Sequence, residues 1–134
     1  EDLFKKIIDE ALPLGLRFVN LTGSGEPFLN KNLTKYVKYL SDNNVYSLIQ
    51  TNGKLLNLKN FQQLCEAGLD ILKISCMGWD KESYKKWMSV DYFNEIREII
   101  KNCLELTKQK KHKTIIQTNH LIQDYEQKDL QLKK

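Results

Sequence analysis

The sequence predicts an α/β fold in which parallel strands are connected by crossover helices. Segments with helical periodicity alternate with short β-rich runs along the chain, always in the order helix then strand, four times over. The β-rich runs are apolar, as is typical of a parallel sheet whose two faces are both covered. Four strands are few for a complete domain and would leave two open edges. The pattern therefore favours part of a larger barrel or wound sheet.

Two helix–strand pairs are predicted in the first half of the chain. Apolar residues recur with helical spacing over residues 3–11, and Pro13 ends this helix before a strand over residues 16–22. The same spacing marks a second helix over residues 33–40. Turn-forming residues close that helix, and a β-rich run over residues 45–50 follows.

The second half contains two more helix–strand pairs, over residues 57–68 and 71–75 and over residues 80–106 and 114–118. Asn57 suits the N-cap of the third helix, and Gly68 the position just after its end. The fourth helical segment is expected to break near residues 89–91 and then to resume. The polar residues after the last strand are expected to be helical or frayed.

The composition indicates a folded domain. Of the 134 residues, 41% are hydrophobic, which is enough for a core and excludes disorder as a description of the whole chain. Polar residues interrupt the apolar runs within a few positions, so no membrane span is expected. The net charge of +4 is a mild excess, and basic and aromatic residues form no stripe. A nucleic-acid partner is therefore not expected.

The cysteines favour a reducing compartment. Cys65, Cys76 and Cys103 are odd in number and widely spaced, which implies no disulfide framework and matches no iron–sulfur pattern. We expect them to be buried and structural. No signal peptide is recognised, so the cytoplasm is the expected location. Because the chain begins with Glu1 rather than Met, we also expect it to be a piece of a larger protein.

Small and polar residues follow all four predicted strands. The strand ends read Thr-Gly-Ser-Gly-Glu-Pro at 22–27, Gln-Thr-Asn-Gly at 50–53, Ser-Cys-Met-Gly-Trp-Asp at 75–80 and Gln-Thr-Asn-His at 117–120. In parallel α/β folds, ligands bind where the carboxyl ends of the strands meet. The group suits a zwitterionic or ribose-bearing ligand, and Glu26 could accept a hydrogen bond from an ammonium. Ordinary turn residues are the alternative interpretation.

The two-residue alternation of strands places many of these side chains on one face. If Ser75 points inward, Lys73 does too, whereas the residues between and after them face the helices. The same alternation turns four further polar residues inward: Asn20, Thr22, Gln117 and Asn119. Polar groups inside a covered sheet are costly unless they are paired or bound to something. We therefore expect a polar lumen that holds a ligand.

The order of these motifs resembles the radical S-adenosylmethionine (SAM) superfamily. Residues 21–29 read Leu-Thr-Gly-Ser-Gly-Glu-Pro-Phe-Leu, Thr51-Asn52-Gly53 follows the next strand, and Ser75 precedes a glycine and a helix that carries Tyr84. The Gly-Glu-Pro tripeptide alone is a weak signal, but three such motifs at successive strand ends are more specific. Within the superfamily, the chain is most similar to the branch that includes the molybdenum-cofactor, peptide-modifying and SPASM-type enzymes.

The resemblance implies a partial (β/α)6 TIM-like barrel that binds SAM and a [4Fe-4S] cluster. Three cysteines of a CxxxCxxC loop bind three irons, and the amino and carboxylate groups of SAM chelate the fourth. One electron then cleaves SAM to a 5′-deoxyadenosyl radical, which abstracts hydrogen from a substrate. Residues 1–134 would form a single domain fragment that contains the second to fifth strands of the barrel.

The resemblance also implies which residues bind the cofactor. Carried over by position, they are Gly25, Glu26, Thr51, Ser75, Gln117 and Asn119. The first pair would face the methionyl amine, and the second pair would contact the methionine or ribose part of SAM. The last pair would lie near the ribose or the substrate. The resemblance assigns no catalytic side chain.

One departure from the family pattern bears directly on function: the chain has no CxxxCxxC loop. We expect that loop upstream, so the cluster ligands lie outside the chain and no metal ligand is predicted within it. The resemblance then implies a portion of an oxidoreductase-type radical SAM enzyme, whose substrate (a peptide, sugar or cofactor precursor) stays open. The alternative is a non-catalytic α/β nucleotide-binding or structural module without a cluster. A third interpretation is an isolated piece that binds nothing tightly.

Overall fold

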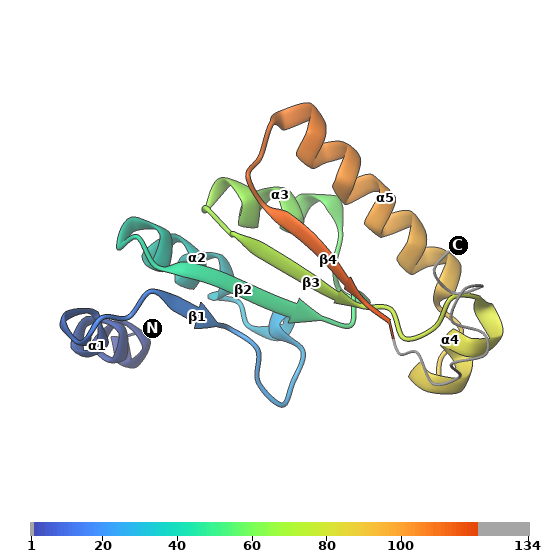
Figure 1. Ribbon diagram of the computed structural model, residues 1–134, viewed down its shortest axis with the longest axis horizontal. Helices are drawn as coiled ribbons and strands as arrows, with labels where there is room; N and C mark the ends of the chain where they lie inside the picture. Colours follow the sequence, from blue (N-terminus) through green and yellow to red (C-terminus); the bar gives the residue numbers. More distant parts are fainter. Residues whose placement is uncertain (1, 121–134) are drawn as a thin grey trace.

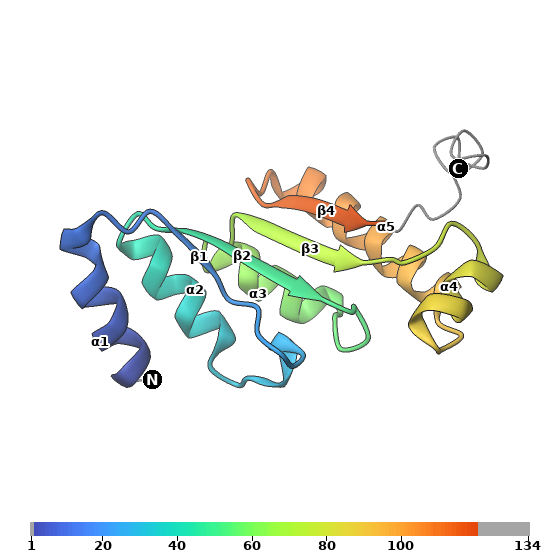
Figure 2. The same ribbon diagram turned by 60° about the horizontal axis from the view of Figure 1, so that its bottom comes forward.

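The computed structural model describes residues 2–120, which form a parallel sheet with helices packed on one side (Figures 1 and 2). The four strands are adjacent in sequence order: β1 (Phe18–Asn20), β2 (Tyr46–Thr51), β3 (Ile71–Ser75) and β4 (Ile115–Asn119). All three strand pairs are parallel. The predicted class, parallel strands with crossover helices, is confirmed. The helix or frayed end predicted after β4 lies outside the described residues.

The helices connect the strands as the periodicity predicts. They are α1 (Asp2–Ala11), α2 (Leu33–Asp42), α3 (Leu58–Glu66), α4 (Lys81–Met88) and α5 (Phe93–Lys110), with two short 3₁₀ segments, η1 (Leu12–Leu14) and η2 (Pro27–Leu29). Ser89 adopts a left-handed conformation with φ of 58° after α4. The expected break near residues 89–91 is therefore a helix end that separates α4 from α5.

The helices cover only one face of the sheet, which differs from the expected two-sided coverage. Each strand lies beside the next strand of the sequence, so the order in the sheet is β1-β2-β3-β4. Because the crossover connections all have the same handedness, every connecting helix lies on the same side of the sheet. Figure 2 shows α1, α2 and α3 together below the sheet. The other face is called the open face below, because no described helix packs on it.

Side chains that alternate along the strands form the main core between the sheet and the helices. Ile49 of β2 and Leu72 and Ile74 of β3 are fully buried, and they pack with Phe61 of α3 and Ile96 of α5. This arrangement confirms that the residues between the inward positions of β3 face the helices. Burial of such apolar side chains is the dominant stabilising contribution to a fold of this kind.

Local hydrogen bonds fix where the helices begin. The Asn57 side chain accepts from the Asn60 backbone N–H at 3.0 Å, and the Asn60 side chain accepts in return from the Asn57 N–H at 2.9 Å. Asp80 and Ser83 form the equivalent pair at the start of α4. Each pair satisfies backbone donors that have no partner within the helix. The predicted N-cap at Asn57 is thus confirmed.

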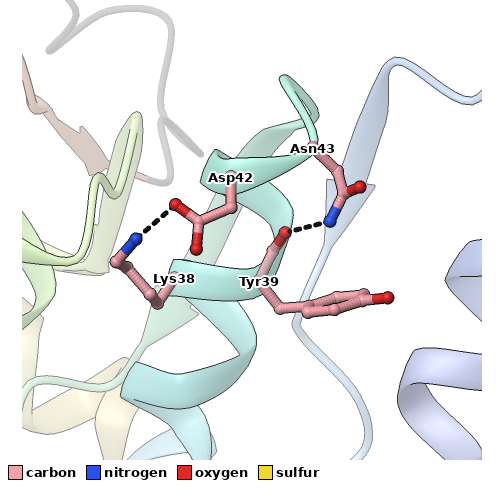
Figure 3. Close-up of polar contacts among 4 residues, drawn as sticks. All are labelled: Lys38, Tyr39, Asp42 and Asn43. Carbon is pink, nitrogen blue, oxygen red and sulfur yellow. Dashed lines mark hydrogen bonds and ion pairs between the residues drawn. The ribbon is translucent and has the colours of Figure 1, made fainter.

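The end of α2 is held by polar contacts on the helix side of the sheet (Figure 3). The Asn43 side-chain amide donates to the Tyr39 carbonyl at 2.8 Å, which satisfies one of the last carbonyls of the helix. Lys38 and Asp42 form an exposed ion pair one turn apart. Exposed pairs of this kind contribute little to stability, so they mark a solvated surface.

Strand β1 is shorter than the predicted run over residues 16–22, for a local reason. The Leu21 N–H still donates to the Leu48 carbonyl at 2.8 Å, but the next donor of β2 takes a side-chain acceptor. That donor is the Gln50 N–H, which bonds to Thr22 Oγ1 at 2.8 Å. The backbone therefore turns away from the sheet while the Thr22 side chain keeps it attached.

Among residues 2–120, no helix is both long and apolar enough to cross a membrane.

Candidate functional site

The open face changes from apolar to polar toward the carboxyl ends of the strands. The strand register aligns Leu48, Ile71 and Ile115 in one row across β2, β3 and β4. The next row toward the carboxyl edge is Gln50, Lys73 and Gln117, and the row after that is Ser75 and Asn119. The sequence-predicted polar face therefore exists, and it lies at the edge where ligands of parallel α/β folds bind.

Glu26 joins the loop after β1 to the end of β2. Its Oε1 accepts from the Thr51 hydroxyl at 2.6 Å and from the Phe28 backbone N–H at 3.3 Å. Its Oε2 accepts from the Asn52 backbone N–H at 3.0 Å. A carboxylate has about four lone-pair positions, so these bonds leave one on Oε2. Glu26 thus fixes the relative position of two predicted motifs and keeps one acceptor position for a ligand.

Thr51 lies differently from the other predicted site residues. Its side chain is 2% exposed and is on the helix side of β2, where the alternation from Gln50 places it. The hydroxyl donates to Glu26 and accepts from the Gly53 N–H at 3.0 Å. Its side chain is therefore not presented to the open face, and the direct contact with a ligand stays a prediction. What Thr51 does here is hold the Glu26 carboxylate.

Ser75 and its neighbours form the outer part of the polar face. Ser75 Oγ lies 3.4 Å from the Gln50 side-chain amide, a long hydrogen bond between β3 and β2. Asn119 is opposite Ser75 in the register and, like Ser75, is half-buried, whereas Gln117 is exposed. The structure thus brings Ser75, Gln117 and Asn119 onto one face, as the alternation predicts.

The glycines of the two motifs have different roles. A Cβ added to Gly25 would have no atom within 4 Å, so a ligand can approach this backbone closely. Gly53 has φ of +79°, and an added Cβ would lie 2.0 Å from Ile96 Cδ1. The Gly53 backbone is therefore packed against α5, whereas the Gly25 backbone faces open space. Only the open surroundings of Gly25 suit a loop that binds a ligand.

Two residues of the polar face, Gln50 and Lys73, were not among the predicted site residues. The alternation that turns Ser75 inward also turns Lys73 inward, and the register then places Gln50 beside it. The strand pattern therefore contained the signal for Lys73. Gln50 already stood in the polar group at the strand end over residues 50–53, but its place beside Lys73 needed the register between β2 and β3.

The cysteines of the chain do not suit a metal cluster. Cys65, Cys76 and Cys103 are free and buried, and Cys76 and Cys103 belong to the core on the helix side. Burial raises the pKa of each thiol, to about 12 for Cys103, and a thiol rather than a thiolate is a poor metal ligand. Within residues 2–120, no group of three or more histidine, cysteine or acidic residues could hold a metal ion. The described residues therefore do not fit a [4Fe-4S] cluster.

The raised pKa of Cys103 predicts that this thiol resists alkylation in the folded protein. At pH 9, a thiol with the ordinary pKa of 9.0 is half ionised, whereas a pKa of about 12 leaves roughly one thiolate in a thousand. We expect iodoacetamide at pH 9 to modify Cys103 at least a hundredfold more slowly in the folded protein than in 6 M guanidinium, as measured by peptide mass spectrometry. Equal rates in the two conditions would contradict the buried placement.

Comparisons with known proteins find several matches to this chain. The model of the radical SAM superfamily matches residues 1–127. A probable GTP 3',8-cyclase of Methanococcus maripaludis is 30% identical over 106 residues, which are 78% of this chain and 35% of that protein. A PqqA peptide cyclase of Bradyrhizobium diazoefficiens is 35% identical over 77 residues, which are 58% of this chain and 20% of that protein. This chain thus spans about a third or less of the length of these curated relatives.

A solved structure has the same fold. The crystal structure of BtrN in complex with AdoMet and 2-DOIA superposes with a TM-score of 0.61 at 21% sequence identity. The match covers 88% of this chain and 43% of the BtrN chain. At this identity, the likeness concerns the arrangement of strands and helices.

Proposed function

The chain belongs to the radical SAM superfamily, and from that premise we propose that it forms the SAM-binding part of a larger catalytic barrel. One observation carries the proposal. Hydrogen bonds from Thr51 and Asn52 to Glu26 join two of the motifs, and Ser75 lies at the same edge of the sheet, in contact with Gln50. The three motifs follow one another in the order that the resemblance implies. In this proposal, residues 1–134 contain the second to fifth strands of the barrel.

The roles of the individual residues follow from their positions. The open backbone at Gly25 and the remaining acceptor position of Glu26 would bind the amino group of SAM, because an ammonium needs acceptors and close approach. The hydroxyl of Ser75 and the amide of Asn119 would contact the methionine or ribose part. Gln117 would lie nearer to the ribose or to the substrate. Thr51 acts through Glu26 as a positioning residue.

In this superfamily, SAM bound beside a reduced cluster supplies a radical that abstracts hydrogen from a substrate. We assign no residue of this chain to the cluster, because its thiols are buried on the helix side. What the chain contributes is the orientation of SAM at the carboxyl edge of the sheet. Oxidoreductase-type chemistry and a cytoplasmic location belong to the same proposal, and the three free cysteines suit a reducing compartment.

The Gly25→Ala variant tests the proposed function. We expect it to bind SAM at least tenfold more weakly, because a methyl group at this position would occupy the space through which the ligand approaches the backbone. The thermal unfolding midpoint should stay unchanged, since the added Cβ meets no protein atom. Anaerobic calorimetric titration of the full-length protein with SAM measures the affinity.

Gly23→Ala is the matched control, because Gly23 lies in the same loop and is equally free of neighbours. We expect it to change SAM affinity by less than about threefold. Equal weakening by both variants would point to a stiffened loop and not to contact at Gly25. A wild-type protein that binds no SAM would overturn the proposal and favour the third interpretation, a piece that binds nothing tightly.

A further inference from the structure

Lys73 lies in the middle of the open face with a charge that the described residues do not balance. It is half-buried on β3, with Gln50 of β2 and Gln117 of β4 beside it in register. No ion pair or hydrogen bond joins its ammonium to any residue of the described range. A cation on this face without a protein partner is available to pair with a ligand that supplies negative charge. Gln50, Lys73 and Gln117 are together called the lysine row below.

The neighbours of Lys73 support the same conclusion. The apolar row Leu48, Ile71 and Ile115 lies on one side of the lysine row, and Ser75 lies on the other. The two glutamine side chains are neutral, and each has two N–H donors beside its carbonyl acceptor. Gln50 gives one N–H to Ser75 Oγ, which leaves further donors around one positive charge. The Glu26 carboxylate is already engaged at the end of β2, with Thr51 and Asn52. The local chemistry therefore fits a carboxylate or a phosphate.

The depth of the lysine row separates it from the proposed SAM contacts. Lys73 lies two residues before Ser75 on β3, which is about 6.6 Å farther from the carboxyl edge. Gly25 and Glu26 lie in the loop beyond that edge. An anion at Lys73 would thus sit deeper on the open face than the methionyl part of SAM.

We propose that the lysine row binds an anionic group, a carboxylate or a phosphate, of the enzyme's substrate. The proposal rests on the proposed function, because it takes the open face as the chamber in which substrate and SAM meet. It makes Lys73 a specificity-determining residue that selects substrates with a negative charge at this depth.

The test is a calorimetric titration of the full-length protein with two probe anions, inorganic pyrophosphate and succinate. We expect at least one of them to bind and the Lys73→Gln variant to bind it about ten- to hundredfold more weakly, the effect of losing one charged hydrogen bond. Lys73→Arg should recover most of the affinity. Lys101→Gln, which changes an exposed lysine of α5, is the matched control and should have no effect.

The same variants separate the possible outcomes. If neither anion binds, or if Lys73→Gln binds the anion as tightly as the wild type, the proposal is wrong. If Lys73→Gln weakens SAM itself by tenfold or more, the anion is the carboxylate of SAM, and the assignment to a substrate is overturned. Failure of the proposed function looks different, because the wild type then binds no SAM while the anion titration still reports on Lys73.

Discussion

The Glu26→Gln variant of the full-length protein is expected to bind SAM about ten- to hundredfold more weakly than the wild type. A charged hydrogen bond between a carboxylate and an ammonium is worth roughly 1.5–3 kcal/mol, which converts to a factor of this size. The amide that replaces the carboxylate carries no charge and has a single oxygen acceptor. The loss is therefore expected in the contact with the amino group of SAM.

The same substitution also loosens the contact between two motifs. Glu26 uses both oxygens toward protein donors, with the Thr51 hydroxyl and the Phe28 N–H on one and the Asn52 N–H on the other. A glutamine can satisfy only one of these sides, and its NH₂ group would oppose a donor on the other. We therefore expect the thermal unfolding midpoint to fall by a few degrees, since leaving a polar group unsatisfied costs about 1–3 kcal/mol.

Anaerobic calorimetry with SAM and thermal unfolding measure the two effects separately. Glu105→Gln makes the same chemical change at an exposed position of α5 and should alter neither quantity. Thr51→Val removes the hydroxyl that holds Glu26 and should weaken SAM binding by a smaller factor, because the carboxylate itself remains. Unchanged SAM affinity in Glu26→Gln would remove this carboxylate from the site and leave it a structural clamp.

Much of the fold could be predicted because the spacing of the apolar residues and the positions of the cap and turn residues agree along the chain. The bounds of β3 coincide with the predicted residues 71–75, since a short apolar run lies between Gly68 and a cap at Asp80. The break between α4 and α5 was predicted near residues 89–91, where Ser89 ends α4. The early end of β1 could not be predicted, because it depends on the Thr22 side chain replacing a backbone acceptor.

The site was predicted less completely, because a sequence gives the side of a strand but not the partners of a side chain. Ser75, Gln117 and Asn119 share a face as the alternation requires. Thr51 was carried over from a motif, whereas its own strand parity with Gln50 turns it toward the helices. The hydrogen bonds of Glu26 with Thr51 and Asn52, 25 and 26 positions away, depend on tertiary packing that no local pattern encodes.

The Gly53→Ala variant is expected to destabilise the protein by about 2–5 kcal/mol, although the change adds only one methyl group. Gly53 has φ of +79°, where a residue with a Cβ is strained by roughly 1–2 kcal/mol. The new Cβ would also lie 2.0 Å from Ile96 Cδ1, and Ile96 is fully buried. Overpacking of a well-packed core typically costs a further 1–3 kcal/mol.

A double-mutant cycle with Ile96→Val separates the backbone strain from the overpacking. Valine lacks the Cδ1 atom that meets the new methyl group, so the clash should be relieved while the strain at φ of +79° remains. Ile96→Val alone should cost about 0.5–1.5 kcal/mol, and the double variant should be more stable than the sum of the single effects predicts. Urea unfolding of the four proteins measures these free energies. Strict additivity would show that Gly53 is required for its backbone conformation alone and that α5 does not pack tightly on this turn.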